Sequence, residues 1–419
     1  MDKYFSFLDN QINDLLRVDI GFSTCPAADI YPLQPEVLEG YQKRHGLIRK
    51  FQDITADLFR ASLAQEADPA IAGLIINELP QSFGWIWHRE LHERAREMGI
   101  SLQPAFFRTD EVVPGKISEI QSPGSLWCQC EQLYSFYEHF SQDFKKKPVF
   151  PGSMAGQFAR DLKKHLDDQP LVHHLLDNAS IQSGMRFFLQ RTRDHGVRYF
   201  GYDKDVSAYD CNFIRAHAFH GLMSDNYFKT RFDAWQNKRL HYDLPPSIVF
   251  DEKIPLIFPF WKKTRDMYPD EIREIFPYTT LVDPENIVLE DGERMDIHEF
   301  FQLPRKRRDY FLKYAGCDLD ANWGSKGVYS MQAMTGKTAG RIKSLLTEGY
   351  KHNRYWILQK SYSVKEDIAY LDRSSGLQET TATAKYSGFY GPCGLMGILV
   401  MHRPFYKVHG AGDTIVSIC

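Results

Sequence analysis

The chain has 419 residues, of which 43% are hydrophobic, 25% charged and 14% aromatic, a composition that argues against a disordered chain. The formal net charge of −3 provides no general basic surface and argues against a nucleic-acid scaffold. No apolar run reaches the length of about eighteen residues that a membrane helix needs, and the N-terminus lacks a basic segment followed by an apolar one. We therefore expect a globular protein with no membrane span, no signal peptide and a small partner.

The seven cysteines are an odd number scattered along the chain, which favours reduced thiols and a cytoplasmic location over a disulfide framework. The length fits either two or three domains or one large α/β enzyme with inserted layers. No internal repeat or low-complexity tract divides the chain.

The first hundred residues alternate helical and strand-like patterns. Helices are predicted over 36–64 and 82–98, the second ending at a glycine. The run AIAGLIINEL, residues 70–79, is rich in Ile and is followed by Pro80, which favours a buried strand. Two strands around Pro114-Gly115 follow over 105–121, and helical spacing returns over 126–144.

The remainder of the chain becomes increasingly strand-like. A helix is predicted over 157–177 and a strand over 197–202, and SIVFDEKIPLIFPFWKK predicts an apolar strand, a turn and a helix-like run. Asp291-Gly292 indicates a hairpin. Further strands are predicted over 310–314, 327–331, 355–362, 379–390 and 397–403. These patterns predict a mixed α/β (α+β) fold, with boundaries between regions of the chain near residues 150 and 300.

The clearest local signal for a ligand lies between two of these strands. The first strand carries Lys313, a loop with Gly324, Ser325, Lys326 and Gly327 follows, and a second strand begins at Val328. Glycines let the backbone approach a phosphate closely, and the lysines supply positive charge. The chain contains neither GxxxxGK[ST] nor a GxGxxG that opens a helix, so a plain structural hairpin loop remains the alternative.

Two shorter patterns carry polar side chains. WILQK, residues 356–360, is a strand that could border a flat ring such as adenine. Earlier in the chain, Arg108 and Asp110 precede the Pro114-Gly115 turn, and Glu119 and Gln121 follow it, each pair at i, i+2 spacing. That spacing places both pairs on one face of a hairpin, as oxygen ligands for a metal or as exposed charges.

In this order, the motifs resemble the circularly permuted branch of the ATP-grasp ligases, which includes glutathionylspermidine synthase and the butirosin-pathway ligase that loads an amino acid on a carrier protein. In that branch an Arg-x-Asp pair and a Glu-x-Asn pair precede the nucleotide-binding strands. The resemblance implies an ATP-grasp fold with a preATP-grasp-like region over 1–150, a connecting and substrate region over 151–300 and a nucleotide-binding region over 301–419.

The resemblance also implies roles, residue by residue. Arg108 would meet the transferred phosphate, and Arg403 near the C-terminus would meet the acyl phosphate, with Lys407 as a second choice. Mg²⁺ would be held by Asp110, Glu119 and Gln121, although Gln121 stands where the family has Asn. The triphosphate would be held by Lys313 and the loop of Gly324, Ser325, Lys326 and Gly327. Gln359 and Lys360 would border adenine, and Ser122 and Ser125 would lie near the acyl substrate.

Other polar groups carry weaker signals. His88 and His92 share a helical face, but the glutamates between and beside them do not match a zinc protease motif. Cys128 and Cys130 lack the two-residue gap of a zinc or redox pair. Lys253 is explained equally well by a turn. The basic run over 305–308 is a solvated cluster that could also attract an anion toward Lys313.

The resemblance implies an ATP-dependent ligase that activates a small-molecule or peptide carboxylate as an acyl phosphate and joins it to an amine, releasing ADP and phosphate. Two alternatives remain open at this point. The same first step could load an amino acid on a carrier-protein thiol, or the chain could be a non-catalytic nucleotide-binding protein. The sequence does not identify the acid or the acceptor.

Overall fold

The structure is a computed structural model of the whole chain. It describes residues 2–16, 21–78, 97, 103–121, 126–150, 152–166, 170–175, 179–200, 211–216, 234, 237, 239–242, 250, 252–316, 327–405, 407–408 and 412–419. The helix predicted over 82–98 lies outside these residues, apart from residue 97. Within the described part of the chain, every helix is too short or too polar to cross a bilayer. No disulfide joins any of the six cysteines that the structure describes.

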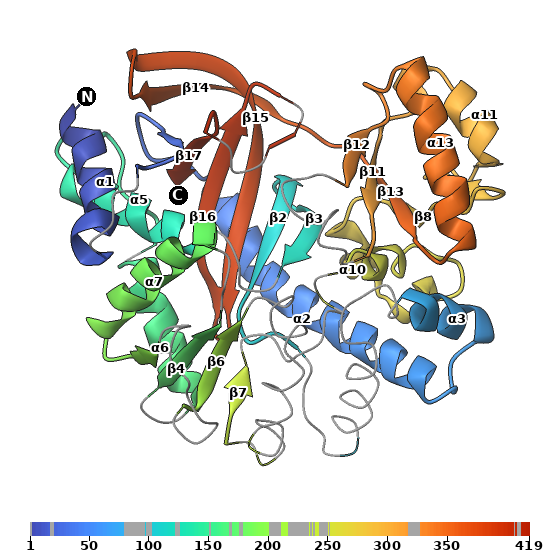
Figure 1. Cartoon of the computed structure of the whole chain (residues 1–419), viewed down its shortest axis with the longest axis horizontal. Coiled ribbons are helices and arrows are strands. Elements are labelled where there is room, and N and C mark those ends of the chain that lie inside the picture. Colours follow the sequence, from blue (N-terminus) through green and yellow to red (C-terminus); the bar gives the residue numbers. More distant parts are fainter. Residues whose placement is uncertain are drawn as a thin grey trace.

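A seven-stranded sheet forms the centre of what we call the large lobe (Figure 1). Its strands follow the order β1, β17, β16, β15, β2, β3, and β14 also pairs with β15. Their bounds are β1 (Cys25–Pro26), β2 (Phe107–Val113), β3 (Lys116–Gln121), β14 (Lys365–Asp372), β15 (Gly376–Gly391), β16 (Gly394–Arg403) and β17 (Ile415–Ile418). The sheet thus joins early and late parts of the chain, while the predicted three-region division stays a prediction.

Helices cover both faces of this sheet (Figure 1). On β16, Leu399 and Met401 pack into the cluster formed with the helices on one face, whereas Ile398 and Val400 pack toward α2 on the other. This alternation follows from the period of two in a strand. The helices are α1 (Asp2–Leu16), α5 (Trp127–His139), α6 (Met154–Leu166) and α7 (Ala179–Arg193) on the first face and α2 (Pro35–Leu63) on the second. The predicted helix over 36–64 is confirmed by α2, and α5 confirms the helix predicted over 126–144 as far as His139.

The strand predicted over 70–79 is wrong, because this segment forms helix α3 (Pro69–Glu78). The Asp68 carboxylate accepts a hydrogen bond from the Ala70 backbone N–H at 2.8 Å, as a residue at a helix start does. Ile71, Leu74 and Ile75 are buried, at spacings of three and four residues. The apolar run therefore buries one helical stripe against the core, and its Ile content was a misleading signal.

A four-stranded parallel sheet lies below the large sheet in Figure 1. The helix predicted over 157–177 is wrong in its second half, because α6 ends at Leu166 and a strand follows. Parallel pairing on both sides of that strand selects the extended conformation. In spatial order the strands are β5 (Arg198–Phe200), β4 (Leu171–Leu175), β6 (Phe213–Ala216) and β7 (His241–Tyr242). The strand β5 confirms residues 198–200 of the strand predicted over 197–202, and residues 201 and 202 lie outside the described residues.

The small lobe is built on a four-stranded antiparallel sheet (Figure 1). Its spatial order is β12 (Val328–Ser330), β11 (Tyr310–Tyr314), β13 (Trp356–Lys360) and β8 (Thr279–Leu281). Leu312 and Leu358 pack in one cluster with residues of α11 (Ile297–Gln302) and α13 (Gly336–Lys351). Alternation therefore turns Lys313 and Gln359 to the opposite face of the sheet.

Short elements complete the small lobe and its connection to the large one. The predicted Asp291-Gly292 hairpin is present, and the helix-like run after Lys253 forms 3₁₀ turns in place of an α-helix. These elements are β9 (Ile287–Val288), β10 (Arg294–Met295), α10 (Asp270–Glu274), η2 (Ile254–Ile257), η3 (Arg265–Met267) and η4 (Arg305–Arg307). The strands predicted in the last third of the chain are confirmed by β11, β12, β13, β15 and β16.

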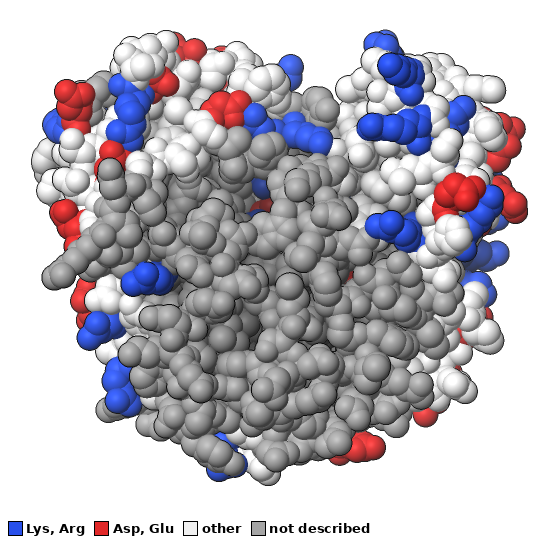
Figure 2. Space-filling view, viewed as in Figure 1, with Lys and Arg blue, Asp and Glu red and all other residues white. Residues whose placement is uncertain are grey.

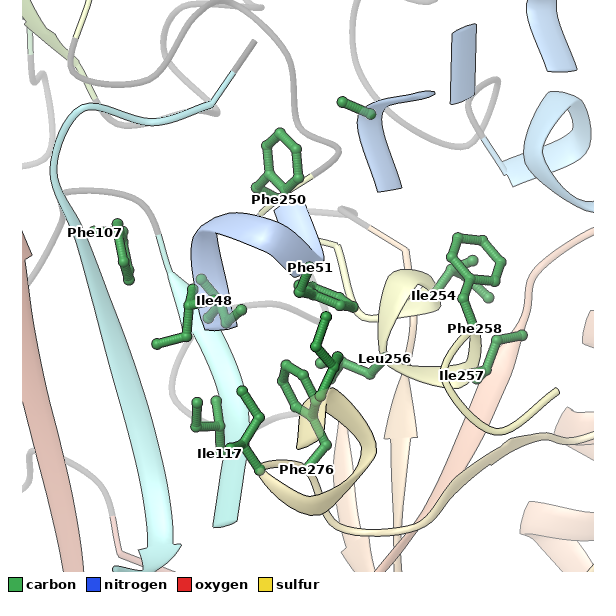
Figure 3. Close-up of a cluster of buried hydrophobic side chains, with 14 of the residues drawn as sticks. Ile48, Phe51, Phe107, Ile117, Phe250, Ile254, Leu256, Ile257, Phe258 and Phe276 are labelled. Atoms are coloured by element: carbon green, nitrogen blue, oxygen red, sulfur yellow. The ribbon is translucent and has the colours of Figure 1, made fainter. Parts of the chain in front are cut away.

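A shared hydrophobic cluster fixes the β2–β3 hairpin between the lobes (Figure 3). Phe107 and Ile117 from the hairpin, Ile48 and Phe51 from α2, and Phe276 beyond α10 are all buried in it. The Ile117 backbone N–H also donates to the Ile275 carbonyl at 2.7 Å. The back of the hairpin is therefore anchored in a core, which leaves its polar face to meet the small lobe.

Candidate functional site

The β2–β3 hairpin brings four predicted site residues onto one face. Asp110 is the register partner of Glu119, and Arg108 is the partner of Gln121. Gly115 has a φ of 94°, a left-handed conformation that glycine adopts without steric cost, and so closes the turn. The predicted hairpin and the grouping of these side chains are confirmed. Ser122 and Ser125 lie outside the described residues.

Asp110 is buried and accepts hydrogen bonds from three surrounding side chains. Arg108 donates to Oδ1 through Nε at 3.0 Å and to Oδ2 through Nη2 at 3.2 Å. Lys385 Nζ donates to Oδ2 at 2.9 Å, and Ser387 Oγ donates to Oδ1 at 2.7 Å. Burial alone would raise the pKa of Asp110, but Arg108, Lys385 and Ser387 hold it well below its ordinary value. The Asp110 carboxylate is therefore ionised and surrounded by donors.

Glu119 meets the small lobe through two lysines. Lys253 Nζ lies 3.2 Å from Glu119 Oε1, and Lys313 Nζ donates to the neighbouring Ser118 carbonyl at 3.0 Å. Burial would raise the pKa of Glu119, but the charges of Lys253 and Lys313 lower it. Burial also lowers the pKa of Lys313 to about 8, although Glu119 opposes that shift. The amino groups of both lysines are thus held beside β3 at the junction of the lobes.

The assembled site contains more positive than negative charge. Arg108, Lys253, Lys313 and Lys385 face Asp110 and Glu119 within one network of hydrogen bonds, ion pairs and electrostatic contacts. Figure 2 shows the molecule hollowed between its two lobes, with Lys and Arg side chains bordering the hollow on both sides. An excess of cations in a largely buried site favours a polyanionic ligand such as a triphosphate.

Sequence patterns missed part of this network. Lys385 and Ser387 lie on β15, which the sequence showed only as a strand, and Lys253 was explained equally well by a turn. The i, i+2 spacing of Lys385 and Ser387 within a predicted strand was the only available signal, since it places both on one face. Only strand pairing shows which face that is, because Ser387 is the register partner of Asp110.

The oxygen ligands do not fit the full metal shell that the resemblance implies. Among the residues that the structure describes, no three His, Cys, Asp or Glu side chains come together as a metal site. The Asp110 oxygens already accept hydrogen bonds from Arg108, Lys385 and Ser387, and the Gln121 amide oxygen accepts one from Arg108. Of the two carboxylates, Glu119 is the more accessible, with 25% of its side chain exposed against 4% for Asp110.

The predicted adenine-bordering residues lie on opposite faces of the small-lobe sheet. Gln359 shares the face of Lys313, is buried and donates to Thr279 Oγ1 at 3.2 Å. Lys360 lies on the helix-covered face, where its Nζ is 3.6 Å from a Glu290 carboxylate oxygen. A ligand on the Lys313 face would therefore lie on the side of the sheet that carries the Gln359 side chain, opposite the Lys360 side chain. Of the predicted glycine loop, Gly324, Ser325 and Lys326 lie outside the described residues, and Gly327 directly precedes β12.

The C-terminal arm reaches toward the small lobe. Met401 is the register partner of Lys385, and Arg403 lies two residues beyond Met401. Arg403 is therefore on the same face of the sheet as Lys385. Arg403 Nη2 donates to Asp413 at 2.7 Å. Lys407 Nζ lies 5.8 Å from the centre of the Tyr329 ring on β12. The arm that follows Arg403 thus contacts the strand that follows the predicted glycine loop.

Comparisons with known proteins support the fold and nothing finer. No protein-family model and no curated protein matches the chain. The solved apo structure of a glutathione synthetase-like effector, GSS30, from Globodera pallida is similar, with a TM-score of 0.53 over 98% of this chain and 94% of that chain. Its sequence identity is 12%, so the similarity concerns the fold alone. The chain has a mixed α/β, glutathione synthetase-like fold, and this similarity is consistent with the predicted ATP-grasp-like architecture.

Proposed function

We propose that this protein is an ATP-dependent carboxylate–amine ligase of the circularly permuted ATP-grasp type. The observation that carries the proposal is the cation-rich site between the lobes, where Lys253 and Lys313 face the hairpin residues Asp110 and Glu119. The order of the elements also supports it, since the hairpin precedes the nucleotide-binding strands β11 and β13 along the chain.

The proposed reaction has two steps. A carboxylate oxygen of the first substrate attacks the γ-phosphorus of ATP, the bond from that phosphorus to the bridging oxygen breaks, and ADP leaves. An amine nitrogen then attacks the acyl carbon of the acyl phosphate, phosphate leaves and the amine loses a proton. Both steps develop negative charge on phosphoryl oxygens, which cations in a water-poor site stabilise.

The residues of this chain have distinct places in the proposal. Lys313 and Lys253 bind the triphosphate from the small lobe, and Arg108 and Lys385 approach from the large lobe. Arg403 reaches the acyl phosphate from the adjoining part of β16, and Gln359 borders adenine. The predicted loop of Gly324, Ser325, Lys326 and Gly327 covers the phosphates. Mg²⁺ enters only as the ion that ATP carries, with Glu119 as its ligand from the chain.

The test measures ATP binding by calorimetry and ADP release against a panel of amino acids, short peptides and other carboxylates, each with and without amines. We expect ATP binding and substrate-stimulated ADP release, both weakened in Glu119→Gln. Glu379→Gln, an exposed position on β15, is the matched control and should match the unaltered protein. ATP binding without any stimulated ADP release would remove the ligase proposal, and no ATP binding would remove the ATP-grasp argument as well.

Two other functions share part of this proposal, and one of them has an observation in its favour. The saturated hydrogen bonding of Asp110 favours a nucleotide-binding protein without catalysis, which would bind ATP and release no ADP. Loading of a carrier-protein thiol would share the first step and differ in the acceptor. Mass spectrometry of carrier proteins incubated with the protein, ATP and the active acid separates a thioester product from an amide.

A further inference from the structure

The surroundings of Asp110 are complete without a metal ion. Two hydrogen bonds from Arg108, one from Lys385 and one from Ser387 reach its two oxygens. A carboxylate offers about four lone-pair sites for such bonds. An ion bound to either oxygen would have to displace one of these donors, and Ser387 and Arg108 are themselves buried.

Lys385 supplies the positive charge that a bound metal ion would otherwise bring to the Asp110 carboxylate. Its Nζ lies 2.9 Å from Asp110 Oδ2, and 16% of its side chain is exposed. Its place is set by strand pairing, because Ser387, two residues further along β15, is the register partner of Asp110. The lysine is therefore fixed by the sheet beside the carboxylate, in a pair with little access to solvent.

We propose that the Lys385 ammonium takes the place of a metal ion beside Asp110, so that Asp110 orients Arg108 and Lys385 and is not a metal ligand. The inference deepens the proposed function, because it identifies which cations of this chain meet the phosphates. Under this proposal Asp110 leaves the expected ligand set of Asp110, Glu119 and Gln121, and Glu119, whose side chain is 25% exposed, is the carboxylate that would meet an ion brought by a nucleotide.

The decisive test uses Mn²⁺ as a spectroscopic substitute for Mg²⁺ and needs no nucleotide. Electron paramagnetic resonance measures the free Mn²⁺ that remains after titration of the intact protein. We expect weak binding to the unaltered protein and to Lys385→Arg, which keeps the cation. Lys385→Met, which removes the charge at nearly the same length, should bind Mn²⁺ at least about tenfold more tightly, since it leaves Asp110 beside Glu119 without that ammonium.

Two further variants make the result specific. The double variant Lys385→Met with Asp110→Asn should lose the gained site, and Lys365→Met, at an exposed position on β14, should bind Mn²⁺ as weakly as the unaltered protein. Mn²⁺ binding by the unaltered protein that Asp110→Asn abolishes would overturn the proposal. No gain in a folded Lys385→Met protein, shown by an unchanged circular dichroism spectrum, would overturn it as well.

A second arm keeps the inference testable if Lys385→Met does not fold. With the unaltered protein and a non-hydrolysable ATP analogue, we expect one bound Mn²⁺ for each bound nucleotide, and two would overturn the proposal. Absence of nucleotide binding in this arm counts against the proposed ligase function, whereas the nucleotide-free titration of the unaltered protein against Asp110→Asn still decides the role of Asp110.

Discussion

Lys253 Nζ lies 3.2 Å from Glu119 Oε1, so an ion pair joins the segment leading into the small lobe to the hairpin of the large lobe. The side chain of Lys253 is only 11% exposed, and its backbone N–H donates at 3.2 Å to the carbonyl of Ala315, the residue after β11. The two lobes therefore meet through charged groups that a phosphate could also bind. A phosphate bound between the lobes would replace Glu119 as the partner of Lys253.

Lys253→Met should weaken ATP binding by roughly 10- to 100-fold, the cost of one charge-assisted hydrogen bond of about 1.5–3 kcal/mol. Calorimetric titration with ATP measures the change in Kd. Lys263→Met is the matched control, because Lys263 pairs with Asp68 at the surface and is 42% exposed. An unchanged Kd in Lys253→Met, with the control also unchanged, would place the phosphates elsewhere.

Lys313 gives the free energy of unfolding a distinctive pH dependence. Its pKa is about 8 in the folded protein against 10.5 ordinarily, so the unfolded chain holds the proton more tightly between these values. Below about pH 8 the buried charge lowers the free energy of unfolding by on the order of 3 kcal/mol. This destabilisation disappears as the pH rises toward 10.5.

We therefore expect the unaltered protein to gain stability relative to Lys313→Met as pH rises from about 8 to 10.5. Urea unfolding of both proteins at a series of pH values measures the difference between their free energies of unfolding. The groups that both proteins share titrate alike, so their contribution cancels in this difference. A difference that stays constant with pH would show that Lys313 has an ordinary pKa. If Lys313 binds the triphosphate as proposed, the same variant should also bind ATP more weakly.

A buried ion pair holds the hairpin turn against α2. Arg44 Nη2 donates to Glu111 Oε2 at 3.1 Å, and the Gly115 backbone N–H donates to the same oxygen at 2.7 Å. Arg44→Met should lower the free energy of unfolding by about 3 kcal/mol, because it leaves a buried carboxyl without its cation. Glu111→Gln should cost less, since the amide oxygen can still accept from Gly115.

Chemical denaturation of these variants tests the pair, and Lys43→Met on the same helix is the control. Lys43 pairs with Glu39 at the surface, with exposures of 72% and 61%, so its loss should change the free energy of unfolding by less than about 0.5 kcal/mol. Equal effects of Arg44→Met and Lys43→Met would contradict a structural role for the buried pair.

Arg403 is expected to act after ATP is bound. If it stabilises the acyl phosphate, Arg403→Ala should lower kcat for ADP release by about 100-fold while changing the Kd for ATP by less than about twofold. Arg373→Ala, which removes a surface arginine paired with Asp9, is the control. A larger Kd for ATP with an unchanged kcat would instead assign Arg403 to nucleotide binding.

The sequence by itself determined the local elements whose pattern is complete within a short window. The β2–β3 hairpin followed from alternation around Pro114-Gly115, and its polar face followed from the spacing of Arg108, Asp110, Glu119 and Gln121. Segment 70–79 was mistaken for a strand because an apolar run alone does not distinguish a buried strand from a buried helix. The signal that distinguishes them here is Asp68-Pro69, which begins the helix.

Only the tertiary structure decided which charges meet at the hairpin. Lys385 and Ser387 follow Asp110 by 275 and 277 residues and reach it because β15 pairs with β2. Lys253 and Lys313 come from the other side of the cleft, where the packing of the lobes sets their distance from Glu119 and Ser118. Pairing between distant strands depends on the burial of whole faces, which no local spacing encodes. That pairing placed an ammonium beside Asp110, where the family resemblance had implied a metal ion.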